Sequence, residues 1–236
     1  MTTRPYAPIE WDLVPTRTAL IVIDAQNDFL HSEGWYALRG VDIEHMRRCI
    51  EPIKQLVAAC RARDVPIIWT LHGFRDAQDG GWLVSMRPFL REGGLRIGTW
   101  GYELLEELGA GDRDRYVVKN RLSAFYQTNL ELQLRAIGAE TVLIAGVLTN
   151  QCVAATSKDA MFRDLKPIVV EEATGTTLPH LHAPALEMMR VGWAEVRGLE
   201  ASLQALRALP ARQAGAVGEE SHPGQDPLPG QDRVRA

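Results

Sequence analysis

The segment 141–164, TVLIAGVLTNQCVAATSKDAMFRD, constrains the fold of this chain more than any other. Its apolar run at 142–145 is typical of a strand that is buried on both faces, and Gly146 interrupts that run. The stretch 147–151 is too short and too polar to form an element of its own, and from Cys152 onward apolar residues recur with helical spacing. The pattern therefore predicts a strand, a tight turn and a helix that begins at a cysteine.

A cysteine at the start of a helix has two interpretations. The unpaired backbone N–H groups and the dipole of a helix N-terminus lower the pKa of a thiol, and the same N–H groups can bind an oxyanion. Alternatively, Cys152 packs beneath the turn as an unreactive core residue, because free cysteines are often buried. The position of Cys152 does not by itself decide between a nucleophile and a core residue.

The remaining apolar runs alternate between the strand and the helix type. Strands are predicted at 18–23, 65–71, 115–119, 167–170 and 195–197, and helices at 42–63, 102–108, 129–137, 184–191 and 200–208. The stretch 171–177 reads as a polar loop, and the long Gly-rich stretch 73–100 as a lid or an assembly surface. We therefore expect a three-layer α-β-α fold with a doubly wound, mainly parallel sheet.

This sequence predicts one domain over residues 18–209. Residues 1–17 form a lead-in that contains proline, and residues 210–236 are rich in Gly, Pro, Gln and charged residues without an apolar period. Such a composition predicts a disordered tail.

Composition narrows the functional classes. A net charge of −4 argues against partners such as nucleic acids or an anionic membrane surface, and leaves a small-molecule substrate. The three cysteines form no CxxC pair, which predicts a reducing compartment, no disulfides and no structural zinc. Cys49 and Cys60 lie on the apolar face of the predicted helix at 42–63 and are expected to be inert. No apolar run approaches membrane-spanning length and no leader pattern precedes the domain, so we expect a cytoplasmic protein.

The usual motifs for nucleotide cofactors and serine hydrolases are missing from this sequence. No GxGxxG follows the first predicted strand, and no Walker motif or GxSxG elbow occurs in the chain. We therefore expect no cofactor.

Three chemically complementary residues occupy the predicted carboxyl ends of strands, where ligands gather in open parallel sheets. Asp24 follows the first strand, Lys119 ends the third, and Cys152 follows the central one. Considered one at a time, each residue has an ordinary structural interpretation: the aspartate as a turn cap, the lysine as a solvated cation and the cysteine as a core residue. Together, a carboxylate can accept the thiol proton and an ammonium can stabilise the thiolate, which favours Cys152 as a nucleophile.

His72, at the end of the second predicted strand, has three interpretations. It can act as a base, bind a metal ion, or form a hydrogen bond with a loop carbonyl. A metal site needs converging ligands, and no second His or Cys lies nearby, while Asp76 and Asp79 are only loosely placed. The sequence therefore predicts no metal site.

Three segments of the chain resemble a known family: ALIVIDAQNDF at 19–29, VVKNRLSAF at 117–125 and VLIAGVLTNQCVAAT at 142–156. Together they resemble the isochorismatase-like cysteine hydrolases, a superfamily that includes nicotinamidases, N-carbamoylsarcosine amidases, biuret hydrolases and ureidoacrylate amidohydrolases. The resemblance spans about residues 16–209. It implies a hydrolase of linear amide or ureido C–N bonds that works without a cofactor, assembled as a homodimer or a homotetramer.

The resemblance also implies roles for individual residues. Asp24 would be the general base, Lys119 the group that orients and stabilises, and Cys152 the nucleophile that forms a thioester. The family further implies a cis peptide bond between Val147 and Leu148. The N–H groups of Leu148 and Cys152 would then form the oxyanion hole.

The substrate class follows less directly from the resemblance. The stretch WTLHGFRDAQD at 69–79 lacks the Asp-x-His pair of metal-dependent nicotinamidases, and the presence of Cys152 favours amide chemistry over cleavage of a vinyl ether. The motifs look most like the ureidoacrylate amidohydrolase branch and then the biuret hydrolases. The alternatives are a nicotinamidase- or isochorismatase-type hydrolase of another small molecule, a non-catalytic binding or scaffold member, and a redox or isomerase role for the thiol.

Several residues near the strand ends are candidates for contact with such a substrate. They are Gln26, Asn27, Phe29, Trp69, Phe125, Tyr126 and Gln151. Trp82 is a further candidate wall, and Arg87 or Arg121 could pair with a substrate carboxylate. For each aromatic residue, ordinary core packing is an equal alternative.

Overall fold

The computed structural model describes residues 9–210, so the tail expected at 210–236 lies outside the described residues apart from its first position. A six-stranded parallel sheet forms the centre of the molecule, in the order β3-β2-β1-β4-β5-β6. The strands are β1 (Thr18–Ile23), β2 (Ile67–His72), β3 (Arg115–Lys119), β4 (Thr141–Val147), β5 (Lys166–Gly175) and β6 (Glu195–Arg197). The predicted parallel α/β fold is confirmed.

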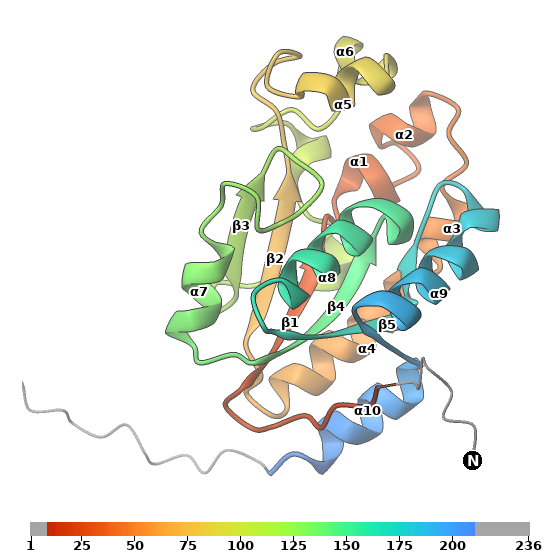
Figure 1. Cartoon of the computed structure of the whole chain (residues 1–236). Helices are drawn as coiled ribbons and strands as arrows, with labels where there is room; N and C mark the ends of the chain where they lie inside the picture. The colour runs from red at the N-terminus through yellow and green to blue at the C-terminus, as the bar shows by residue number, and fades with distance from the viewer. Residues whose placement is uncertain (1–8, 211–236) are drawn as a thin grey trace, which may run out of the picture.

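Helices cover both faces of the sheet and its carboxyl edge (Figure 1). The longer ones are α4 (Ile50–Arg61), α7 (Leu130–Ala136), α8 (Ala154–Met161), α9 (His182–Gly192) and α10 (Leu199–Ala208). The shorter ones are α1 (Asn27–Leu30), α2 (Trp35–Leu38), α3 (Glu44–Arg47), α5 (Gly81–Met86) and α6 (Phe89–Glu92).

Alternate residues along the strands face opposite sides of the sheet, as the period of an extended chain requires. In β1, Leu20 and Val22 belong to the core shared with α4 and α10, whereas Ile21 and Ile23 belong to the core shared with α7, α8 and α9. Every residue of β1 is buried. The fully apolar runs of the central strands therefore follow from burial on both faces.

The chain reverses its winding direction at β1, which pairs with β2 on one side and with β4 on the other. Connections that run away in opposite directions leave a crevice beyond the carboxyl ends of the two strands. Asp24 directly follows β1, and Cys152 lies shortly after β4. The fold thus brings two of the sequence-predicted site residues to this switch point.

The helix predicted over 42–63 is divided into α3 and α4. Pro52 lies in the first turn of α4, and its ring removes the N–H that would bond the carbonyl of Arg48 and would also clash with it. A continuous helix through Arg48 is therefore excluded, and α4 begins just after it.

Three other expectations about local structure were wrong. Strand β5 extends to Gly175, through most of the stretch expected to be a polar loop, because after a shift in register Thr174 and Gly175 pair with Gly146 and Val147 of β4. The turn expected at 147–151 contains a single π-helical turn, η3 (Thr149–Val153), which includes Cys152. The helix expected at 102–108 is replaced by two 3₁₀ turns, Trp100–Tyr102 and Glu106–Leu108.

The long stretch 73–100 contains α5 and α6, which lie beyond the carboxyl end of β2 at the top of Figure 1. This position places the segment above the edge of the sheet where Asp24, Lys119 and Cys152 are found. Within residues 9–210, no helix is both long and apolar enough to cross a bilayer.

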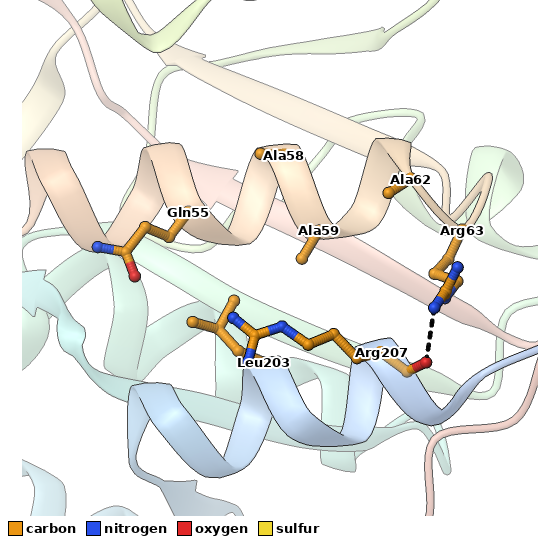
Figure 2. A pocket seen from close by; sticks show the side chains of 7 residues that line it. All are labelled: Gln55, Ala58, Ala59, Ala62, Arg63, Leu203 and Arg207. Carbon is orange, nitrogen blue, oxygen red and sulfur yellow. Dashed lines mark hydrogen bonds between the residues drawn. The ribbon is translucent and has the colours of Figure 1, made fainter.

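A shallow groove of about 330 Å³ lies between α4 and α10, on the face of the sheet away from α8 (Figure 2). Alanine side chains of α4 border it, and Arg63 crosses its end to donate a hydrogen bond to the carbonyl of Arg207 at 2.8 Å. The groove contains none of the candidate site residues and has no part in their chemistry.

Candidate active site

Asp24, Lys119 and Cys152 converge at the carboxyl edge of the sheet. The Asp24 carboxylate pairs with the Lys119 ammonium at 2.7 Å, and both side chains are fully buried. The Cys152 thiol, the Asp24 carboxylate and the His72 imidazole each have an atom within 4.8 Å of the others. Cys152 is only 3% exposed, so the cluster is sealed from bulk solvent in this conformation.

Asp24 is held in place by its neighbours on β2 and β4. It has a φ of 50°, a left-handed conformation that aspartate tolerates better than most residues. Thr70 of β2 donates its hydroxyl proton to Asp24 Oδ1 at 2.6 Å and accepts the Asp24 N–H at 3.1 Å. On the other side, Gly146 has a φ of +109°, and a Cβ there would lie 2.0 Å from the carbonyl oxygen of Ile23.

The Lys119 ammonium contacts three groups. It forms an ion pair with Asp24 Oδ2 at 2.7 Å, donates a hydrogen bond to the carbonyl of Arg121 at 3.0 Å, and lies 3.4 Å from His72 Nδ1. All three contacts suit an ammonium group, which has three donors and no acceptor. Lys119 is therefore fixed in position rather than solvated.

Burial and charge determine the protonation of the cluster. Burial raises the pKa of Asp24, against the opposing effect of the Lys119 ammonium, so this carboxylate is a stronger base than a solvated one. The pKa of Lys119 is also raised, because burial, which lowers it, is outweighed mainly by the negative charge of Asp24. The pair combines a basic carboxylate with a permanent cation.

The expectation that a helix N-terminus lowers the pKa of Cys152 is not met. Burial raises the pKa of the thiol to about 12, opposed by the Lys119 ammonium and assisted by the Asp24 carboxylate. Cys152 also lies in η3, before the first residue of α8, rather than as the first residue of a regular helix. The resting thiol is therefore protonated, and its activation requires a base within reach.

Asp24, His72 and Cys152 are also three residue types that bind metal ions. However, the Lys119 ammonium contacts both Asp24 and His72, so a cation already stands among the three potential ligands. A divalent metal would have to displace that buried charge. The arrangement fits a protonated lysine better than a metal ion.

Two of the predicted substrate contacts have structural hydrogen bonds instead. Gln26 accepts the N–H of His72 at 2.8 Å and donates to the carbonyls of His72 at 3.1 Å and Tyr102 at 2.7 Å. Asn27 donates to the carbonyl of Trp100 at 2.8 Å. Both amides join the end of β1 to neighbouring segments, with Gln26 fully buried.

The predicted aromatic contacts are divided between core and surface. Phe29 is buried against Tyr36, with ring centroids 4.7 Å apart, and Phe125 is buried beneath the guanidinium of Arg163. Trp69 donates its indole N–H to Asp114, the residue before β3, and is thereby directed away from the carboxyl edge. Tyr126 is 50% exposed.

The long segment 73–100 contacts Gln151, the residue that precedes Cys152. Arg87, between α5 and α6, donates a hydrogen bond to the side-chain carbonyl of Gln151 at 2.5 Å. Arg121 instead bonds the carbonyls of Asp79 and Asn120 and supports the loop after β3. Trp82 is 85% exposed and lines no described part of the cluster.

Two residues of the site's surroundings were missed at the level of the sequence. Thr70 precedes His72 by two positions, so strand alternation alone would have placed the two on one face of the sheet. Tyr36, whose pKa is raised by burial against the opposing charge of Arg87, had no signal beyond its aromatic character. Leu148 is buried, and the Val147–Leu148 peptide bond is cis, as the resemblance implies.

Comparison with known proteins shows the family to which the sequence is similar. Residues 18–201 match the family described as the isochorismatase domain. The chain is 34% identical over 188 residues to the ureidoacrylate amidohydrolase RutB of Klebsiella pneumoniae subsp. pneumoniae, covering 74% of this chain and 80% of that protein. It is 34% identical over 224 residues to RutB of Methylorubrum extorquens, covering 86% and 90%.

Solved structures with a similar fold are also hydrolases by their names. A cysteine hydrolase from Pseudomonas syringae pv. phaseolicola superimposes with a TM-score of 0.80 at 25% identity, covering 89% of this chain and all of that one. The nicotinamidase PncA from Bacillus subtilis has a TM-score of 0.65 at 26% identity, covering 77% and 99%. Each alignment covers nearly the whole length of the solved structure.

Proposed function

The chain belongs to the isochorismatase family, and from that premise we propose that it is a cysteine-dependent amidohydrolase of a small ureido or carbamoyl substrate. Its relatives support a hydrolase that acts on amide or ureido C–N bonds. One observation carries the finer proposal: a protonated thiol, a basic carboxylate and a fixed ammonium lie together in one buried cluster. These are the groups that a thioester mechanism needs.

In the first half of the reaction, Asp24 takes the proton of Cys152 and the thiolate attacks the substrate carbonyl carbon. The electron pair of the carbonyl moves to its oxygen, for which the N–H groups of Leu148 and Cys152 are the proposed donors. When the carbonyl re-forms, the C–N bond breaks, and the leaving nitrogen takes the proton from Asp24. Ammonia or an amine departs and a thioester remains on Cys152.

In the second half, Asp24 takes a proton from water, and the resulting hydroxide attacks the thioester. Collapse of this intermediate breaks the C–S bond, and the thiolate recovers the proton from Asp24. Lys119 remains charged throughout, because its raised pKa keeps the ammonium protonated, and it stabilises each anionic state of the pair. The cluster returns to its starting protonation.

The substrate class is inferred from the relatives and from Arg87. The two curated relatives above are ureidoacrylate amidohydrolases, and ureidoacrylate carries a carboxylate as well as a ureido group. Arg87 extends from the segment 73–100 to Gln151, the residue before the nucleophile, and its guanidinium can bind a carboxylate with two parallel hydrogen bonds. We therefore propose a ureido acid as the substrate.

Ammonia release from a panel of compounds tests this proposal. The panel contains ureidoacrylate, biuret, N-carbamoyl amino acids, nicotinamide and maleamate, each with and without a chelator. We expect turnover of a ureido acid that persists with chelator and is lost in Cys152→Ala. Cys49→Ala is the matched control, because Cys49 is buried in the other core and should leave activity intact.

Substitution of Arg87 tests whether the protein recognises the substrate carboxylate separately from the ureido group. Arg87→Met should raise the KM of ureidoacrylate about tenfold or more, while that of the neutral substrate biuret changes little.

In the substrate panel, turnover that Cys152→Ala retains would contradict the cysteine mechanism. Inactivity on every compound, together with a Cys152 that iodoacetamide does not label, would favour a binding role instead.

A further inference from the structure

His72 occupies a central place in the cluster, although the mechanism above gives it no role. It ends β2, which lies between β1 and β3, and it is in register with Lys119. Its Nδ1 atom lies 3.4 Å from the Lys119 ammonium, 3.8 Å from the Asp24 carboxylate and 3.9 Å from the Cys152 thiol. The imidazole therefore contacts all three groups.

The neighbours of His72 determine where its proton resides. Lys119 can only donate, so Nδ1 must accept, and a neutral imidazole then carries its proton on Nε2. Burial, together with the positive charges of Lys119, Arg87 and Arg121, holds the pKa of His72 well below its ordinary value, so the ring is neutral. Nε2 is thus an N–H donor.

This donor is buried and has no acceptor among residues 9–210. A buried donor without a partner destabilises the folded state, so in native proteins such groups usually pair with water or with a ligand. Gln26 fixes the main chain of His72 by accepting its N–H and donating to its carbonyl, and Phe74 packs against the ring with centroids 5.0 Å apart.

We propose that His72 is a specificity residue that donates a hydrogen bond from Nε2–H to an oxygen of the bound ureido acid. Its Nδ1 at the same time holds the Lys119 ammonium in place. The same ring lies 3.9 Å from the thiol through Nδ1, so an oxygen bound at Nε2 would be on a molecule next to Cys152. The partner must be a carbonyl or carboxylate oxygen, because a second N–H would leave both donors unpaired. This inference rests on the proposed function.

Two substitutions of His72 distinguish the role of Nδ1 from the role of Nε2. In His72→Asn the amide can present an acceptor where Nδ1 lies but reaches no further, whereas the longer amide of His72→Gln can present an N–H near the position of Nε2. We expect His72→Asn to raise the KM of ureidoacrylate about tenfold with a smaller change in kcat, and His72→Gln to restore most of that loss. Melting temperatures of both variants report any general damage to the fold.

Nitrogen NMR of the full-length Cys152→Ala protein tests the same inference without turnover. We expect a neutral His72 ring protonated at Nε2, and a shift of that N–H resonance when ureidoacrylate is added. A ring protonated at Nδ1, or an Nε2–H resonance that ureidoacrylate does not move, would overturn the proposal. Equal KM values in His72→Asn and the wild type would also overturn it, because water would then be the partner. If Cys152→Ala kept its turnover, the cysteine mechanism would fail, but the resonance would still report on His72.

Discussion

At the scale of the residue, burial makes Asp24 more basic and Cys152 less acidic at the same time. The raised pKa of the carboxyl and the thiol pKa of about 12 bring neither group to a state of spontaneous reactivity. Transfer of the proton from Cys152 to Asp24 leads to reaction only when a substrate carbonyl is bound, so that the thiolate can attack it. The fixed charge of Lys119 stabilises the anionic state of the pair, which is why the contacts that hold the ammonium in place matter.

The pH dependence of kcat/KM should report the titration of Asp24. The base works only when it is deprotonated, and its pKa lies above the ordinary value of 3.8, so activity should fall as the pH decreases through that raised pKa. His72 stays neutral, so His72→Asn should keep the same acid limb. A midpoint below 3.8, or a limb near 6.5 that vanishes in His72→Asn, would contradict this assignment.

At the scale of the element, the close approach of β1 and β4 creates the site. Ile23 pairs with Gly146, and the lack of a side chain at Gly146 lets the two strands meet just before Asp24. The positive φ of Gly146 is a second reason for glycine, because other residues are strained there. Packing at one residue of β4 thus controls the position of the base that follows β1.

Replacement of Gly146 should therefore damage both stability and activity. Gly146→Ala should lower the free energy of unfolding by about 2 kcal/mol or more and lower kcat by displacing Asp24. Gly192→Ala is the matched control, because a Cβ there meets nothing within 4 Å, and it should be close to neutral. Thermal melts and kinetics measure both effects. A Gly146→Ala protein as stable and active as the control would contradict the packing argument.

The elements show how far the sequence could predict the site. The convergence of Asp24, Lys119 and Cys152 could be predicted from the sequence alone, since buried apolar runs fix the strands and parallel strands end at one edge. The roles of Gln26 and Trp69 could not be predicted, because their hydrogen-bond partners come from distant segments of the sequence. Gln26 bonds the carbonyls of His72 and Tyr102, and Trp69 bonds the carboxylate of Asp114. The register shift that extends β5 likewise depends on pairing with β4.

At the scale of the whole molecule, the expected homodimer or homotetramer remains a prediction. Two large apolar side chains of α5, Trp82 and Met86, are four positions apart and are 85% and 76% exposed. Side chains at this spacing share a helix face, and exposed apolar faces commonly bind a partner. A second copy of this chain is the partner that the family resemblance implies.

Light scattering tests the assembly. The wild type should have two or four times the mass of the 26.2 kDa chain, and Trp82→Ser combined with Met86→Ser should lower it. Leu132→Ser, which changes another exposed apolar residue, on α7, is the control and should leave the mass unchanged. A wild-type protein that already has the mass of one chain would contradict the prediction.

The central claim is that Cys152 forms a covalent bond to the substrate carbonyl. Rapid quenching of the wild type during ureidoacrylate turnover, followed by intact and peptide mass spectrometry, tests it most directly. The account predicts an adduct with the mass of the substrate less its leaving amine, located on the peptide that contains Cys152 and absent from Cys152→Ala. Turnover without any adduct, undiminished in Cys152→Ala, would contradict the account.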